Sequence, residues 1–66
     1  MQVTVNGKPH DLAGSLSVRA LLEHLDLAKG PVAVEINRVI VPRAEHPQTM
    51  VTEGDAIEIV HLVGGG

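Results

Sequence analysis

The sequence contains no cysteine, phenylalanine, tyrosine or tryptophan. Without cysteine, no disulfide can cross-link the fold, and cysteine usage gives no indication of a redox compartment. Without aromatic rings, there is no platform on which nucleic-acid bases can stack. The formal net charge of −3 comes from acidic and basic residues mixed along the chain, so no basic patch is available to neutralise phosphates. We therefore expect no nucleic-acid partner.

Long apolar runs are also missing. No run approaches the roughly 20 apolar residues that a helix needs to span a bilayer. Met1 is followed at once by the alternating residues 2–5, a pattern typical of a strand and not of a charged and then apolar leader segment. We expect a cytoplasmic protein with no membrane partner.

No grouping of side chains indicates catalysis or metal binding. The histidines occur one per segment and lack the i, i+4 spacing of a ligand pair; they are His10, His24, His46 and His61. Glu53, Asp55 and Glu58 lie close in sequence, but a solvated turn and strand explain them better than an acid–base site. We predict no metal site, no bound cofactor and no enzymatic activity of the chain itself.

The first residues of the sequence predict a β-hairpin. Residues 2–5 alternate polar and apolar side chains, as in a strand with one buried face. Asn6-Gly7 is the strongest short signal for a type I′ turn, in which both residues need a positive φ. Residues 8–12 form the returning strand, and Pro9 favours a sheet edge because proline cannot donate a ladder hydrogen bond.

An amphipathic helix follows the hairpin. Its apolar residues recur at i, i+3, i+4 and i+7, which form one stripe: Val18, Leu21, Leu22 and Leu25. Ser17 is placed to cap the N-terminal amides, and Leu16 can pack on Leu21 across that cap. Gly30-Pro31 ends any continuation of the helix.

The second half of the sequence predicts mainly extended structure. Strands are expected at residues 32–36, 39–41 and 56–62, and a short extended piece is expected at 49–52. Residues 43–48 are expected to be irregular, with at most one helical turn before Pro47, and residues 53–55 are expected to form a turn.

This order of elements predicts an α+β domain in which one main helix packs across a mixed sheet of four to five strands. Parallel pairing of the first and last strands lets the helix cover the inner face of the sheet. That layout is a ubiquitin-like β-grasp, assigned here to residues 1–63. The expected core comprises Val3, Val5, Val18, Leu21, Leu22, Leu25, Val34, Ile36, Ile57 and Ile59.

The sequence ends in three glycines, and residues 64–66 are expected to form a flexible tail. Glycine offers no side chain to bury, so a frayed end is the simplest interpretation. Four residues from Val63 onward also reach roughly 13 Å when extended, which is enough to carry a carboxylate into a channel too narrow for a Cβ. The pattern alone leaves both interpretations open.

The last strand offers a candidate docking surface beside that tail. If Ile57 and Ile59 face inward, Val60 and Leu62 are left on the outer side. Neighbouring exposed apolar residues can mark a partner site, and ordinary edge packing explains them equally well.

Taken in order, several short motifs resemble the ThiS family, the sulfur carriers of thiamine (thiazole) biosynthesis. The motifs are Val5-Asn6-Gly7, Leu21-Leu22-x-x-Leu25, Val34-Glu35-x-Asn37, Ile40-Val41-Pro42-Arg43, Gly54-Asp55-x-Ile57-Glu58-Ile59-Val60 and Val63-Gly64-Gly65-Gly66. Each motif is weak alone, but their order, the length and the terminal diglycine are jointly specific. The resemblance covers the whole chain and implies the β-grasp fold.

The resemblance implies a function at Gly66. In this family an E1-like (ThiF-type) adenylyltransferase uses ATP to convert the terminal carboxylate into an acyl-adenylate. Sulfur that originates from cysteine and is delivered through a cysteine desulfurase then displaces AMP and leaves a thiocarboxylate. A ThiG-type thiazole synthase takes that sulfur into the thiazole ring. The lack of cysteine agrees with this chemistry, because no thiol of the chain can hold a persulfide.

Each residue of the last motif receives a role from the resemblance. Gly66 is the modified group, while Gly64 and Gly65 form the slim stalk that enters the partner's channel. Arg43 can support partner contact through its charge, although a plain surface ion pair explains it better. The candidates for partner docking are Val60, Leu62 and Val63.

Other functions share the same tail. The small subunit of molybdopterin synthase has the same fold and diglycine end, but it tends to be longer and to carry a phenylalanine near its C-terminus, which this sequence lacks. A ubiquitin-like protein modifier would join Gly66 to a lysine through an isopeptide bond. A binding module with an idle tail is a third alternative, which deletion of Gly66 separates from a carrier.

Overall fold

The computed structural model describes residues 1–62. Seven strands, one α-helix and one 3₁₀ turn occur in these residues. In chain order they are β1 (Gln2–Val5), β2 (Lys8–Asp11), β3 (Leu16–Ser17), α1 (Val18–His24), β4 (Val32–Ile36), β5 (Val39–Val41), η1 (Arg43–Glu45), β6 (Met50–Val51) and β7 (Ala56–His61). The expected glycine tail, 64–66, and the candidate docking residue Val63 lie outside the described residues.

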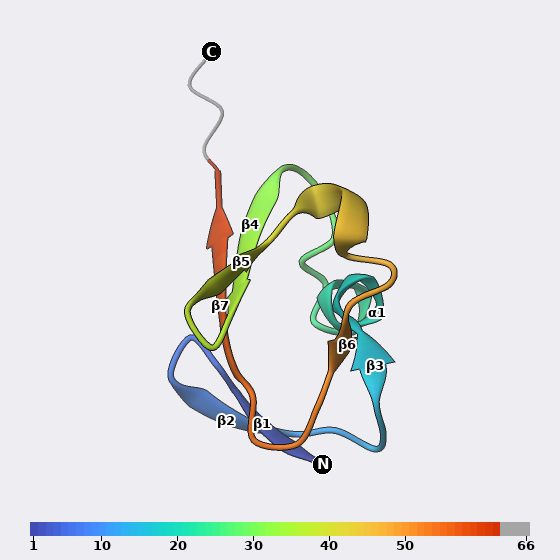
Figure 1. Ribbon diagram of the computed structural model, residues 1–66, viewed down its shortest axis with the longest axis vertical. Coiled ribbons are helices and arrows are strands. Elements are labelled where there is room, and N and C mark those ends of the chain that lie inside the picture. The colour runs from blue at the N-terminus through green and yellow to red at the C-terminus, as the bar shows by residue number, and fades with distance from the viewer. Residues whose placement is uncertain (63–66) are drawn as a thin grey trace.

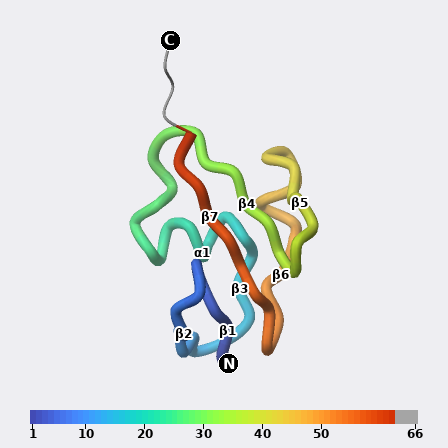
Figure 2. Tube along the Cα trace, turned by 90° about the vertical axis from the view of Figure 1, so that its left-hand side faces the viewer, coloured from blue at the N-terminus to red at the C-terminus, as the bar shows by residue number. Residues whose placement is uncertain are grey.

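Five strands form one mixed sheet in the order β2-β1-β7-β4-β5, with β7 in the middle (Figure 2). β1 and β7 pair in parallel, with Thr4 opposite Ala56 and Val5 opposite Ile57. The other neighbours are antiparallel. The predicted parallel pairing of the first and last strands and the edge position of β2 are therefore confirmed.

Both hairpins of this sheet close through the same kind of turn. Asn6 and Gly7 have φ values of 51° and 81°, as the predicted type I′ turn requires. Asn37 and Arg38 between β4 and β5 have φ values of 52° and 69°. This second turn lacks glycine, and its left-handed backbone was not predicted.

The predicted helix is present, and Ser17 caps it by accepting a hydrogen bond from the Ala20 N–H over 3.0 Å. The helix ends at His24, well before Gly30-Pro31. Asp26 takes a left-handed φ of 59° and donates to the Glu23 carbonyl, while the Leu27 N–H donates to the Leu22 carbonyl over 2.7 Å. This pair of bonds is a Schellman motif, with aspartate in the position that glycine usually takes.

The core lies between the sheet and α1, with β3 and β6 beside the helix (Figure 1). Eight of the ten predicted core residues are buried, while Leu25 and Ile36 are partly buried against the core. Three buried apolar residues were not predicted: Leu12, Val41 and Val51. Val51 belongs to β6, which pairs with β3 in a separate two-stranded sheet. The extended piece expected at residues 49–52 is therefore confirmed as β6, whereas β3 was not predicted, since two residues carry too little periodicity.

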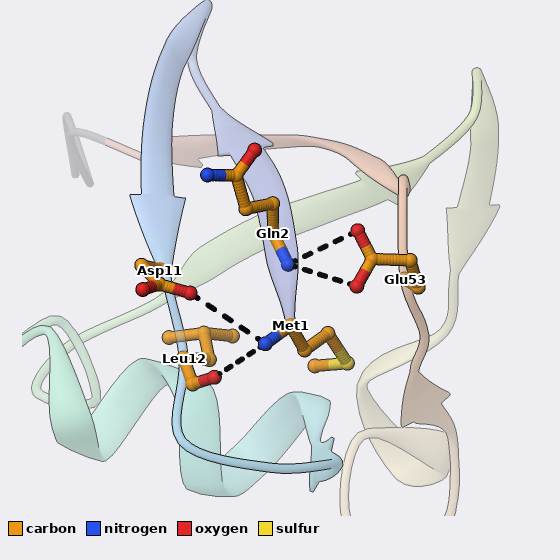
Figure 3. A network of polar contacts seen from close by, with 5 residues as sticks. All are labelled: Met1, Gln2, Asp11, Leu12 and Glu53. Atoms are coloured by element: carbon orange, nitrogen blue, oxygen red, sulfur yellow. Dashed lines mark hydrogen bonds and ion pairs between the residues drawn. The ribbon is translucent and has the colours of Figure 1, made fainter.

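A polar network holds the first residues of β1 at one end of the molecule (Figure 3). The ammonium group of Met1 donates to the Leu12 carbonyl over 2.8 Å and lies 3.5 Å from Asp11 Oδ1. The Gln2 N–H lies 3.1 and 3.2 Å from the two carboxylate oxygens of Glu53. This network lies opposite the end at which β7 finishes (Figure 1).

Within residues 1–62, no helix has the length and apolar character needed to cross a membrane.

Candidate functional site

The candidate site begins where β7 leaves the sheet. β4 pairs with β7 along its length, from Ile36 opposite Ile57 to Val32 opposite His61. One residue later, the Leu62 N–H donates to the Pro31 carbonyl over 3.0 Å. The chain is thus held up to Leu62, directly before the residues that carry the predicted tail chemistry.

Asn6 fastens the first hairpin to β7. Its backbone N–H donates to the Ile57 carbonyl over 2.8 Å. Its side-chain amide accepts from the Ile59 N–H over 2.8 Å and donates to the Ile59 carbonyl over 3.2 Å. These two bonds continue the ladder between β1 and β7 beyond the last backbone pair, Val5 and Ile57. The sequence indicated Asn6 only as a turn residue and missed this role.

Asn37 fastens the second hairpin to the start of β7. Its backbone N–H donates to the Ala56 carbonyl over 2.8 Å, and its side-chain oxygen accepts from the Ala56 N–H over 2.9 Å. Its side-chain nitrogen donates to Asp55 Oδ1 over 3.1 Å. β7 is therefore anchored from both sides by asparagines of two tight turns.

Asp55 corrects one expectation, because its side chain is not solvated: only 9% of the residue is exposed. Its Oδ2 accepts hydrogen bonds from the N–H and the hydroxyl of Thr52, over 2.8 and 3.1 Å. Glu53 and Glu58 are exposed, as expected for a turn and the outer face of a strand. Asp55 is a buried hydrogen-bond acceptor that shapes the turn before β7.

The structure places two of the three candidate docking residues at the surface. Val60 is 56% exposed and Leu62 is 51% exposed, while Ile57 and Ile59 face the core. Val60 lies opposite Ala33 of β4, which is exposed as well. Val39, Ile40 and Met50 are further exposed apolar residues. Exposure alone does not single out Val60 and Leu62, so their docking role stays a prediction.

The histidines do not gather into a metal centre in the part of the chain that the structure describes, where no three His, Cys, Asp or Glu side chains are grouped to hold an ion. His46 is buried, with 5% of its surface exposed. Its Nε2 lies 3.0 Å from the Val41 carbonyl, so this nitrogen carries the proton and donates it.

Comparison with known protein families identifies the family of this chain. The model of the ThiS family matches residues 3–66. The chain belongs to the ThiS family. Sulfur carrier protein ThiS of Escherichia coli (strain K12) is 36% identical over 66 residues, which cover all of both chains. The predicted family membership is confirmed.

A solved structure supports the same assignment at the level of the fold. The crystal structure of the thiamine biosynthesis protein ThiS from Geobacter metallireducens superposes on this ThiS-family chain with a TM-score of 0.86. The two sequences are 42% identical, and the match covers all of both chains. The predicted β-grasp fold, with its mixed sheet and single main helix, is confirmed.

Two longer proteins contain a segment similar to the whole chain. Thiazole synthases of Paramagnetospirillum magneticum and Magnetococcus marinus are 41% and 38% identical to it over 66 residues. The chain spans 20% of the length of each. A ThiS-like segment therefore occurs within proteins named for the synthase.

Proposed function

We propose that this ThiS-family chain is a sulfur carrier of thiamine biosynthesis that holds sulfur as a thiocarboxylate at Gly66. The observation that carries this proposal is the match to the ThiS family over residues 3–66, which includes all three terminal glycines. The full-length similarity to a protein named sulfur carrier protein ThiS supports it. The chain has no cysteine, so a main-chain carboxyl group is the natural place for sulfur.

The chemistry at Gly66 requires activation, because a carboxylate is a poor electrophile. A carboxylate oxygen of Gly66 attacks the α-phosphorus of ATP on an E1-like adenylyltransferase, and pyrophosphate leaves. The terminal sulfur of a persulfide on a cysteine desulfurase-derived donor then attacks the acyl carbon, and AMP leaves. A thiol next attacks the donor-side sulfur of the resulting acyl disulfide, so that a new disulfide forms and the thiocarboxylate leaves. The chain contributes presentation of the acyl group, and its partners contribute catalysis.

Gly64 and Gly65 are the stalk in this proposal, because residues without a Cβ fit a narrow channel. Val60, Leu62 and Val63 are the proposed docking residues at its base. Support for Val60 and Leu62 is their exposure at the end of the anchored strand β7. We place the carrier in the cytoplasm with these partners.

Thiazole synthase is the proposed acceptor of the sulfur. The support is the ThiS-like segment within two proteins of that name. The same finding favours thiamine biosynthesis over the molybdopterin alternative.

The test is incubation of the chain with its adenylating enzyme, ATP and a sulfur source, followed by intact-mass measurement. We expect one oxygen of Gly66 to be exchanged for sulfur. The control is a chain that lacks Gly66, which keeps the whole described fold and should gain no sulfur. An unchanged wild-type mass, or an equal gain without Gly66, contradicts the proposal. A mass that reports a lysine-linked conjugate supports the modifier function instead.

A further inference from the structure

A small cavity lies between α1, the segment that leads into β4, and η1. Its volume is about 140 Å³. Apolar side chains form part of its wall, among them Leu22 and Val32, and the other lining residues include Arg19, Gly30, Arg43 and His46. No carboxylate side chain lines it. An acidic chain, with five lysines and arginines in total, thus brings two arginines and a histidine to one cavity.

The backbone holds these three residues in a fixed arrangement. The Arg19 N–H donates to the His46 carbonyl over 3.0 Å, and the His46 N–H donates to the Arg43 carbonyl over 3.1 Å. The first of these bonds joins α1 to the residue after η1, so the backbone positions from which the three side chains project are fixed relative to one another.

The polar groups of the cavity retain donor capacity. Arg19 contacts Glu23 through Nε alone, over 3.3 Å, so its terminal nitrogens are not used by that ion pair. Within residues 1–62, Arg43 forms no ion pair, although a surface ion pair was the preferred expectation for it. His46 uses Nε2 on Val41. With its proton on Nε2, the ring leaves Nδ1 as an acceptor, so the N–H groups available to an anion are those of the two arginines.

The cavity lies at the end of the molecule where β7 finishes. Val32 of its wall pairs with His61, and Pro31, next to Gly30, accepts the hydrogen bond from Leu62. In Figure 1 the segment before β4 and η1 lie toward the same end as the tip of β7. The cavity therefore lies at the end of the molecule where a protein that receives the terminal residues would bind.

We propose that this cavity, which we call the Arg19–Arg43–His46 cavity, binds an oxyanion, namely an acidic side chain of the adenylating partner. Arginines recognise carboxylates through paired N–H groups, and about 140 Å³ leaves ample room for a carboxylate group. Because the cavity lies beside the base of the tail, such a contact would fix the orientation in which the tail is presented. The identity of the partner rests on the proposed function. The binding of an oxyanion does not.

The partner contact is tested with Arg43→Gln, which removes the charge and keeps the length of the stem. The matched control is Arg38→Gln, which makes the same change in the turn after Ile36, at the opposite end of β7. We expect Arg43→Gln to weaken binding to the adenylating enzyme about tenfold in calorimetry, as loss of a charge-assisted contact does. Arg38→Gln should bind like the wild type. Equal affinities of the two variants overturn the proposal.

Free anions are tested separately by titrating the ¹⁵N-labelled chain with inorganic phosphate against chloride at constant ionic strength. We expect saturable shifts of the Arg19, Gly30 and His46 amides, which Arg43→Gln removes without altering the rest of the spectrum. Phosphate should also compete with the enzyme. If phosphate binds but affinity for the enzyme is unaffected by Arg43→Gln, the cavity is a free-anion site and the contact with an acidic side chain is refuted.

The two proposals fail in different ways. If wild-type chain gains no sulfur at Gly66, the proposed function fails, whatever the phosphate titration shows. If it gains sulfur and Arg43→Gln behaves like Arg38→Gln, only the role of the cavity fails.

Discussion

At the scale of single residues, two asparagines of tight turns determine how β7 is held. Asn6 bonds both backbone groups of Ile59 through its side-chain amide, and Asn37 bonds Ala56 and Asp55. An amide has a donor and an acceptor on one planar group, as a peptide unit does. That is why it can extend a strand ladder where the backbone has already turned away.

Asn6→Asp tests this role with almost no change of shape. Aspartate also tolerates a positive φ, but it has no N–H to donate, so a carboxylate oxygen would face the Ile59 carbonyl. We expect a loss of about 1–3 kcal/mol in the free energy of unfolding, measured by urea denaturation. Gln48→Glu is the control, because it makes the same change of charge at an exposed loop residue. Equal stability of the two variants would show that the amide of Asn6 contributes only to the turn.

At the scale of elements, β7 combines two tasks on its two faces. Ile57 and Ile59 are buried in the core, while Glu58 and Val60 are exposed. The alternation follows from the period of a strand, and it separates stability from recognition. Changes on the outer face of β7 should therefore alter binding without unfolding the domain.

Val60→Thr is a specific test of docking by this element. It replaces a methyl group with a hydroxyl and keeps the β-branched shape that suits a strand. If Val60 is buried against a partner, the unpaired hydroxyl should cost about 1–3 kcal/mol of binding free energy, which calorimetry with the adenylating enzyme would detect. Val39→Thr makes the same change at an exposed residue of β5 and should leave affinity unaltered. A similar effect of both variants would remove Val60 from the docking surface.

At the scale of the whole molecule, the fold depends on one small core without disulfides. A chain of 66 residues is expected to have a free energy of unfolding of only about 3–10 kcal/mol. The loss of one large buried side chain is therefore a substantial fraction of the total stability.

Leu21→Ala tests this dependence on the core. Leu21 is 0% exposed, and truncation of a fully buried leucine costs about 2–5 kcal/mol. We expect a much lower urea midpoint or a largely unfolded chain by circular dichroism. Leu62→Ala, the same change at an exposed leucine, should alter stability by at most about 0.5 kcal/mol. A comparable loss of stability in both variants would mean that Leu62 packs into the domain and is not available to a partner.

Local patterns determined much of this protein. The alternation of residues 2–5, the Asn6-Gly7 turn and the apolar stripe from Val18 to Leu25 each reflect the geometry of one element. Ser17 as a cap and Pro9 on an edge strand follow from a single residue's hydrogen-bonding groups. The motifs that resemble the ThiS family add a role for the three terminal glycines, which the residue pattern alone left open.

Tertiary structure decided what no local pattern contains. The bond between Asn6 and Ile59 joins residues 53 positions apart. β3 pairs with β6 only because the segment after η1 passes beside the start of α1. Burial of Asp55 and the meeting of Arg19, Arg43 and His46 at one cavity likewise depend on separate segments packing together. Sequence periodicity reports which face of an element is apolar, whereas a polar site needs the relative positions of several elements, and those exist only after the core has formed.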